Sequence, residues 1–247
     1  MRLLWTCTAI AALMATSASA RHAPAETRSM IAAALADPAR SDQAIDDARR
    51  KAADVIAFSG VGPGKVVIDY LPGKGYWTRI FTDVVGPKGH VYAYWPAAAA
   101  KRAEPTLADF KTRTLPNVTA EVQGNIPTSP APVDLFWTVE NYHDIANAGG
   151  EAALAAFNKG VFALLKPGGV YLVIDHADAP GSGIADTNTL HRIEPAVVKR
   201  QVLATGFSFV GESDVLRNPA DDHSLKVFDP AIRGHTDQFI YKFRKPG

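Results

Sequence analysis

Short apolar runs alternate with amphipathic stretches along most of the chain. The apolar runs are rich in Val, Ile, Tyr and Phe and have the length of buried strands. Between them, apolar residues recur three and four positions apart, which is the spacing of a helix with one buried face. This alternation predicts a doubly wound α/β domain with a mostly parallel sheet. The predicted strands are 65–69, 90–95, 118–122, 133–139, 170–175, 207–212 and 238–243.

The helical stretches have recognisable ends. Gly86 and Pro87 end one of them, and Pro195 and Gly206 bracket the last. The earliest has acidic-before-basic pairs four residues apart, such as Asp46 with Arg50, which suits an exposed helix face. A turn is predicted at 166–169, where the sequence reads KPGG. The predicted helices are 41–58, 76–85, 97–112 (interrupted near Pro105), 151–165 and 195–205.

The N-terminal residues have the pattern of a targeting segment. Arg2 precedes an apolar stretch over 3–14, and Ala18-Ser19-Ala20 is a small-x-small cleavage signal. We therefore expect residues 1–20 to be a cleaved signal peptide and the protein to be exported, to the periplasm or beyond the cell. Residues 21–60 are then expected to form a helical extension, and 61–247 the α/β domain.

Composition narrows the classes of partner. Lys and Arg number 26 and Asp and Glu 25, so no large net field favours nucleic acid or an anionic membrane. The apolar stretch near the N-terminus is too short to span a bilayer, so no integral membrane association is expected after cleavage. The one cysteine, Cys7, lies inside the predicted signal, which leaves no thiol chemistry for the remainder. A small-molecule substrate is the partner that these features favour.

A glycine-containing loop follows the first predicted strand. That strand ends at Asp69, and the chain then turns through Gly73 and Gly75 into a helix. Such a turn brings the backbone close to a ligand and presents free N–H groups at a helix N-terminus. The loop therefore predicts a ligand pocket.

Three segments together resemble the class I S-adenosylmethionine (SAM)-dependent methyltransferases: VVIDYLPGKGYWTRIF at 66–81, ALLKPGGVYLVIDH at 163–176, and the tail from 205. The NYHD and DHADAPGSG stretches are similar to those of exported bacterial predicted methyltransferases of undefined substrate. The resemblance implies a seven-stranded sheet of order 3-2-1-4-5-7-6 with the last strand antiparallel. It also implies SAM as cofactor, with the glycine loop around its amino-acid end.

Two positions differ from the pattern of that family. Leu71 stands where the family usually has its first glycine, and Trp95 stands where an acid usually binds the ribose hydroxyls. Asn125 matches a position where an Asp often meets adenine. The resemblance thus implies a pocket of altered chemistry, and we expect SAM to bind it weakly. Its predicted cofactor-binding residues are Asp69, Gly73, Gly75, Trp95 and Asn125.

Polar residues follow the fourth and fifth predicted strands. His143 and Asp144 come after one, Asp175 and His176 after the other, and His191 a little later. Ligands gather at the carboxyl ends of the strands in a doubly wound sheet. Methyl transfer to a hydroxyl or an acidic carbon needs a base. His143 or His176 is the predicted base, oriented by Asp144 or Asp175.

The sequence supports three functions. The first is a SAM-dependent methyltransferase acting on an unidentified small molecule or cell-envelope component. The second is a non-catalytic binding protein with an altered or lost cofactor site, because SAM is made in the cytosol. The third is a metal-assisted hydrolase or isomerase, although no histidine pair has the spacing typical of metal ligands and no metal ligand is predicted. The long connection 213–235, with Arg217 and Arg233, is expected to be a lid or acceptor-recognition element over the cleft. The alternative is a structural flap that only covers the end of the sheet.

Overall fold

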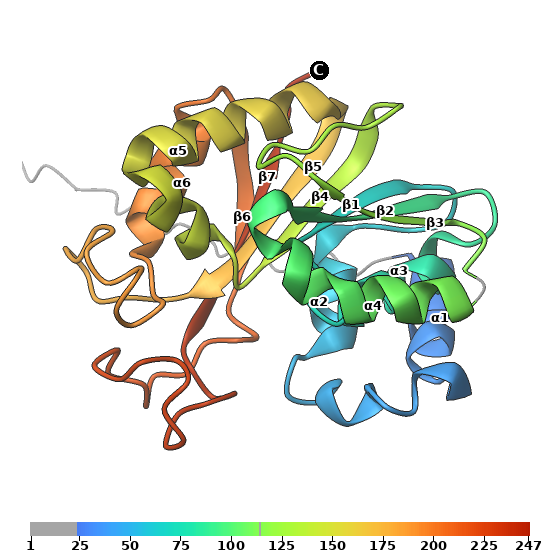
Figure 1. The fold of residues 1–247 in the computed structure, drawn as a ribbon, viewed down its shortest axis with the longest axis horizontal. Coiled ribbons are helices and arrows are strands. Elements are labelled where there is room, and N and C mark those ends of the chain that lie inside the picture. Colours follow the sequence, from blue (N-terminus) through green and yellow to red (C-terminus); the bar gives the residue numbers. More distant parts are fainter. Residues whose placement is uncertain (1–23, 114) are drawn as a thin grey trace, which may run out of the picture.

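Seven strands form one twisted sheet in the computed structural model, which describes residues 24–113 and 115–247 (Figure 1). Their order is β3-β2-β1-β4-β5-β7-β6. β7 runs antiparallel to both of its neighbours, and the other neighbours are parallel. The predicted fold class and strand order are confirmed. The strands are β1 (Val66–Tyr70), β2 (His90–Pro96), β3 (Val118–Gln123), β4 (Val133–Val139), β5 (Leu165–His176), β6 (Ser208–Ser213) and β7 (Gln238–Arg244).

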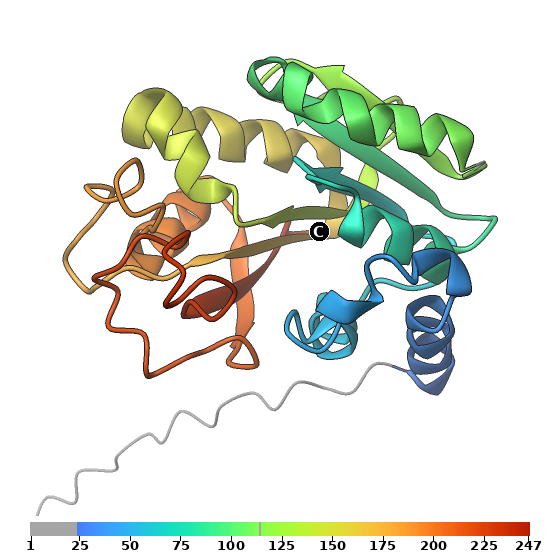
Figure 2. The ribbon, with the colours of Figure 1, turned by 60° about the horizontal axis from the view of Figure 1, so that its bottom comes forward.

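Helices cover both faces of the sheet (Figures 1 and 2). One face packs against α1 (Ala25–Leu35), α2 (Ala52–Ser59) and α3 (Tyr76–Val85). The other packs against α5 (Tyr142–Leu164) and α6 (Pro195–Leu203). The central strands are buried on both sides, as their unbroken apolar runs predicted. α4 (Ala100–Thr112) lies along β2 and β3 at the edge of the sheet.

The predicted helix over 41–58 is wrong in its first half. Short 3₁₀ turns occupy Pro38–Arg40 and Ala44–Asp46, and α2 begins only at Ala52. Contacts to α3 and to the turn itself hold this shape: Arg40 is buried and pairs with Asp47, which also accepts a hydrogen bond from Tyr76. These tertiary contacts outweigh the weak preference of a short polar stretch for a helix.

The helix predicted over 151–165 begins earlier than expected. α5 starts at Tyr142 and breaks at Gly149 and Gly150; Gly150 has φ 63° and ψ −153°, a combination that only glycine adopts without strain. The first piece carries His143 and Asp144 directly after β4. The predicted turn at 166–169 is instead an irregular part of β5, with a register shift against β4.

Residues 1–23 lie outside the described part of the chain, and the predicted signal peptide falls within them. In the segment predicted as a helical extension, Ile31 of α1 and Val55 of α2 pack into the same apolar cluster as β1 and β4. Among the described residues, no helix combines the length and the apolar character needed to cross a membrane.

Candidate functional site

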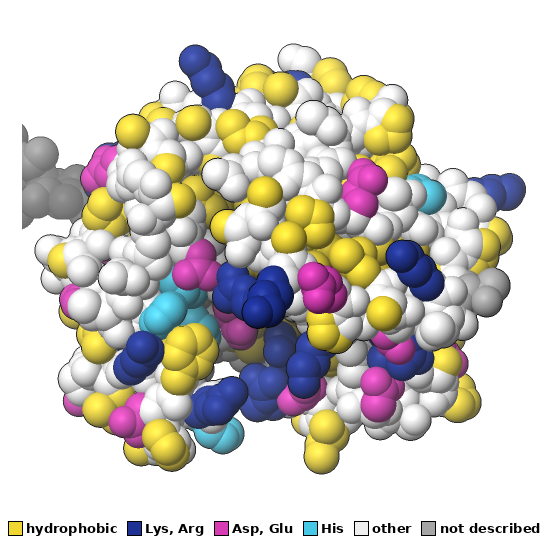
Figure 3. Space-filling model, in the orientation of Figure 1, with side chains coloured by type: hydrophobic (Ala, Val, Ile, Leu, Met, Phe, Trp, Pro, Cys, Tyr) yellow, Lys and Arg dark blue, Asp and Glu magenta, His cyan; other side chains and the backbone are white. Residues whose placement is uncertain are grey.

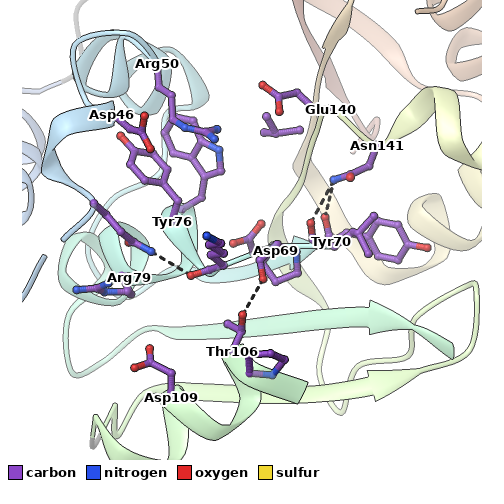
Figure 4. A pocket seen from close by; sticks show the side chains of 18 of the residues that line it. Asp46, Arg50, Asp69, Tyr70, Tyr76, Arg79, Thr106, Asp109, Glu140 and Asn141 are labelled. Carbon is purple, nitrogen blue, oxygen red and sulfur yellow. Dashed lines mark hydrogen bonds between the residues drawn. The ribbon is translucent and has the colours of Figure 1, made fainter. Parts of the chain in front are cut away.

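A cavity of about 580 Å³ opens at the carboxyl ends of β1 and β4 (Figure 4). Its volume is within the range of small-molecule and cofactor sites. The glycine loop forms one wall, the turns over 42–50 another, and α4 a third. Lining residues include Asp42, Asp46, Arg50, Asp69, Leu71, Gly73, Lys74, Tyr76, Trp77, Arg79, Thr106, Asp109, Arg113, Glu140 and Asn141.

Gly73 and Gly75 have different surroundings in the loop. Both are left-handed, with φ 57° at Gly73 and φ 72° at Gly75. A Cβ on Gly73 would meet no atom within 4 Å, so this glycine faces the open cavity that it lines. A Cβ on Gly75 would overlap the ring of Phe110, so this glycine allows α3 and α4 to approach each other.

Strained backbone marks the ends of both strands that border the cavity. Leu71 follows β1 with φ 55°, and Glu140 follows β4 with φ 59°. A non-glycine residue in this region costs about 1–3 kcal/mol and is typical of functional sites. Leu71 thus adopts a conformation that glycine would take freely, and its N–H donates to the Tyr94 carbonyl at 2.7 Å. Asn141 ties the two strand ends together by donating to the Tyr70 and Leu71 carbonyls.

Asp69 lies at the base of the cavity and is nearly inaccessible, with 2% of its surface exposed. Burial raises the pKa of its carboxyl to about 7, and the hydrogen bond donated by Thr78 at 2.6 Å opposes the shift only in part. At neutral pH this carboxyl therefore stands near its midpoint of titration. A cationic ligand group beside it would favour the ionised form.

Cationic side chains approach the cavity from the turn before α2. The Arg50 guanidinium lies 4.7 Å from the centre of the Tyr76 ring, and its buried Nε has no hydrogen-bond partner among the described residues. The indole Nε1 of Trp77 is likewise buried without a partner there. An unpaired buried donor is costly unless a ligand or water completes it. Sequence reasoning missed Arg50 because the tertiary contacts of 38–51, rather than a local pattern, bring it here. Trp77 reaches the cavity from the first turn of α3, directly after the glycine loop.

Three of the five predicted cofactor residues, Trp95, Asn125 and Gly75, do not line this cavity; Gly75 instead packs against Phe110. Trp95 is 2% exposed and packs with Ala103 and Phe110 beneath α4. Asn125 is exposed, and its backbone carbonyl accepts a hydrogen bond from Tyr70 at 3.0 Å. Within the part of the chain that the structure describes, no polar side chain from the end of β2 lines the cavity. Asp109 of α4 instead supplies a carboxylate on that side, where it also pairs with Arg113.

A second cavity of about 420 Å³ adjoins the first and shares Arg50, Trp77 and Glu140 with it. The connection between β6 and β7 forms its other wall, including Arg217, which pairs with Asp237 at 2.8 Å. Arg233 does not line it. On the face drawn in Figure 3, Lys and Arg side chains gather around a hollow, with His side chains beside it.

The predicted catalytic residues come together at the carboxyl ends of β4 and β5. The buried Asp175 carboxylate accepts the His143 Nδ1–H at 2.8 Å and the His143 backbone N–H at 2.8 Å. An ionised carboxylate only accepts, so this contact fixes the proton on Nδ1 and leaves a lone pair on Nε2. Asp144 lies farther away, 3.6 Å from Nε2. The geometry thus makes Asp175, and not Asp144, the residue that orients His143.

His176 is held differently. Its Nδ1 lies 3.2 Å from the Gln238 amide nitrogen and 2.8 Å from the Thr236 hydroxyl. The amide can only donate, so Nδ1 accepts and the proton of neutral His176 is on Nε2. Both partners line the second cavity, so His176 supports that wall from behind.

The pKa values of the histidines differ by environment. Burial lowers the pKa of His143, but the charge and hydrogen bond of Asp175 outweigh burial and hold it above its usual value. Burial lowers the pKa of His176, and the nearby negative charge of Glu140 opposes this only in part. Burial, with the charge of His143, also lowers the pKa of His191.

Comparison with solved structures identifies the fold as that of the class I SAM-dependent methyltransferases. A SAM-dependent methyltransferase from Aquifex aeolicus covers 88% of this chain and 98% of its own, with a TM-score of 0.56 and 18% identity. Geranyl diphosphate C-methyltransferase from Streptomyces coelicolor A3(2), solved with Mg²⁺, geranyl diphosphate and S-adenosyl-L-homocysteine, covers 86% and 87%, with a TM-score of 0.58 and 16% identity.

The same fold also occurs with a different activity. The [4+2]-cyclase SpnF covers 91% of this chain and 97% of its own, with a TM-score of 0.59 and 16% identity. No protein-family model matches the sequence, and no curated protein matches it significantly. At these identities the likeness is one of fold, and a shared fold does not by itself define an activity.

Proposed function

We propose that this protein is a SAM-dependent methyltransferase that acts outside the cytosol on an anionic small molecule or cell-envelope component. One observation carries the proposal. A sheet of methyltransferase order has a cofactor-sized cavity at the carboxyl ends of β1 and β4, floored by the glycine loop, and the His143–Asp175 pair lies at the same edge of the sheet, after β4 and at the end of β5, without lining the cavity.

The residues around the first cavity fit the charges of SAM. Arg50, a cationic residue in the cavity lining, suits the carboxylate of the methionine end, and Asp69 suits a cationic group. Thr106 and Asp109 of α4 are the polar groups that would meet the nucleoside end, in place of an acid at the end of β2. Because Asp109 is already paired with Arg113, it is a weaker partner for hydroxyl groups. The expectation of weak SAM binding therefore stands.

When bound, SAM supplies an electrophilic methyl group. The protein aligns the acceptor and, for a hydroxyl or acidic carbon, removes its proton. His143 is the better candidate base, because Asp175 leaves the lone pair on its Nε2 and holds its pKa above the usual value, whereas burial lowers the pKa of His176. His191 Nδ1 lies 3.3 Å from that Nε2. Asp175 holds His143 in the tautomer that carries its proton on Nδ1, and it stabilises the ring once Nε2 is protonated.

The second cavity is the proposed acceptor site. Its lining has more positive than negative side chains. The cationic residues are Arg49, Arg50, Lys51 and Arg217, and the carboxylate is that of Glu140. Such a field favours an acceptor with a carboxylate or phosphate. Export, expected from residues 1–20, would place such acceptors in the cell envelope.

A non-catalytic binding protein is the second candidate. The left-handed Leu71 and the absence of an acid from β2 in the cavity lining support it, because both alter contacts that the family usually makes with SAM. Native mass spectrometry of protein purified from its own compartment separates the two. S-adenosylmethionine or S-adenosylhomocysteine in the complex supports the enzyme, whereas a different small molecule supports the binding protein.

Turnover provides the direct test. Mature protein is incubated with methyl-labelled SAM and either cell-envelope extract or a panel of small carboxylates and phosphates. We expect transfer of label together with formation of S-adenosylhomocysteine, both lost in His143→Ala. Tight retention of SAM with no transfer to any acceptor would contradict the enzymatic proposal.

A further inference from the structure

Three side chains near the carboxyl ends of β4 and β5 bring ligand atoms close to one another. They are His143 and Asp144 from the first turn of α5, and His191 from the loop before α6. His191 Nδ1 lies 3.3 Å from His143 Nε2, and Asp144 Oδ1 lies 3.6 Å and 4.0 Å from these two nitrogens. Atoms with these separations share a common point about 2.1 Å from each, which is the length of a Zn–N or Zn–O bond.

We propose that His143 Nε2, His191 Nδ1 and the Asp144 carboxylate bind one divalent transition-metal ion. Two imidazoles and one carboxylate form a donor set that suits Zn²⁺ and its neighbours and leaves coordination positions open for water or substrate. The ion would lie near His176, whose ring centre is 6.1 Å from that of His143 and whose partners Thr236 and Gln238 line the second cavity. Its binding does not depend on methyl transfer, because it is measured without SAM.

The surroundings of the three residues support a metal site. The fully buried Asp175 accepts a hydrogen bond from His143 Nδ1–H. This contact orients the ring so that the Nε2 lone pair faces His191. A carboxylate behind a ligating histidine is the usual supporting contact in metal sites, because it fixes the tautomer and raises the basicity of the ligand. The Asp144 side chain is 41% exposed, so the site is open to solvent on its side.

His191 is held in an unusual conformation. Its φ is 57°, in the left-handed region that non-glycine residues rarely adopt, and its ring lies 4.9 Å from that of Phe228. The conformation brings Nδ1 to His143 although the two residues are 48 positions apart. This distance in sequence explains why no ligand spacing is visible in the sequence.

A metal ion and a proton compete for the same lone pair of His143. In the metal-loaded protein, His143 is therefore a ligand and not a base. The ion would then lower the pKa of an acceptor hydroxyl bound at an open position. The metal-free site can therefore activate an acceptor through His143 as a base, and the metal-loaded site can do so through the bound ion.

The test uses tag-free mature protein, treated with EDTA and dialysed, and titrated with ZnCl₂ by calorimetry. Co²⁺ serves as a second probe, read by its visible d–d absorption. We expect one equivalent to bind. His143→Ala and His191→Gly should weaken binding at least about a hundredfold, and Asp175→Asn, which removes only the supporting contact, about 10- to 100-fold.

His191→Gly keeps the left-handed backbone available, and circular dichroism confirms its folding. The matched control is His90→Ala, which removes a histidine from the start of β2, where its Nε2 contacts Thr119. Equal Zn²⁺ binding by the wild type and this control, with loss in the site variants, supports the proposal. No binding of either ion at millimolar concentration, or binding that persists in both histidine variants, would overturn it.

Discussion

At the scale of single residues, burial controls the chemistry of the cavity floor. Among the described residues, no cationic side chain is hydrogen-bonded to Asp69. Burial raises the pKa of its carboxyl to about 7, and the hydrogen bond donated by Thr78 opposes this only in part. The folded protein therefore holds a proton on this carboxyl that the unfolded chain releases near its ordinary value of about 3.9. Between these two pH values, folding stability contributed by Asp69 falls as pH rises.

Asp69→Asn removes this dependence. We expect the variant to gain stability over the wild type as pH increases from 5 to 8, by about 2–4 kcal/mol, because the wild type increasingly bears the cost of an ionised buried carboxylate. Urea unfolding at both pH values measures the difference. Asp54→Asn, at an exposed position on α2, should show no such trend. A stability difference for Asp69→Asn that is equal at both pH values would contradict the assignment.

His143 and His90 give a paired test of the base. Removing a general base typically costs about 10²–10⁴ in rate, so His143→Ala should lower methyl transfer at least about a hundredfold. Asp175→Asn should also lower it, because the amide no longer selects the Nδ1–H tautomer. His90→Ala should retain wild-type turnover. Wild-type rates in His143→Ala would remove His143 from the mechanism.

At the scale of elements, one buried ion pair fixes the connection between β6 and β7. Arg192 and Asp221 are 0% and 2% exposed and make two contacts of 2.9 and 3.0 Å. Arg192 also donates to the carbonyls of Ala177 and Leu225, so it joins the loop after β5 to this connection. The wall of the second cavity depends on that junction.

Arg192→Met leaves the Asp221 carboxylate buried without its partner. We expect a loss of about 3–5 kcal/mol in the free energy of unfolding, which guanidinium denaturation measures. The control is Arg200→Met, which breaks the exposed pair with Glu151 and should cost about 1 kcal/mol or less. Similar losses in the two variants would show that the buried pair does not hold the connection.

Secondary structure was predictable wherever a segment depends on its own pattern. The apolar runs gave the strands, and the glycine after α3 marked its end. The turns over 38–51 were not predictable, because Asp47 is held by Arg40 and Tyr76 rather than by neighbours four residues away. The first turn of α5 was missed because Gly149 and Gly150 separate it from the longer apolar pattern.

At the scale of the whole molecule, the sheet brings together residues that are distant in sequence. The alternation of strands and helices, together with the resemblance to class I SAM-dependent methyltransferases, predicted the strand order. The approach of Asp175 to His143 at the ends of β5 and β4 could therefore be expected. The approach of His191 to His143, and of Arg50 to the glycine loop, depends on loops with no periodic pattern. The prediction that Trp95 lies at the end of β2 was correct. Its packing beneath α4 depends on the volume of its side chain, which its position in the strand does not reveal.

The central claim is that SAM binds in the cavity beside the glycine loop. Calorimetric titration with SAM and S-adenosylhomocysteine tests it on the wild type and two glycine variants. Gly73→Ala places a methyl group in the open cavity. Gly64→Ala is the control: its backbone is also left-handed, with φ 72°, and its Cβ also meets no atom within 4 Å, but it lies outside the cavity lining. We predict a dissociation constant of roughly 10–500 μM, weakened at least about tenfold by Gly73→Ala and unchanged by Gly64→Ala. No binding by the folded wild type at millimolar ligand, or equal binding by all three proteins, would contradict the account.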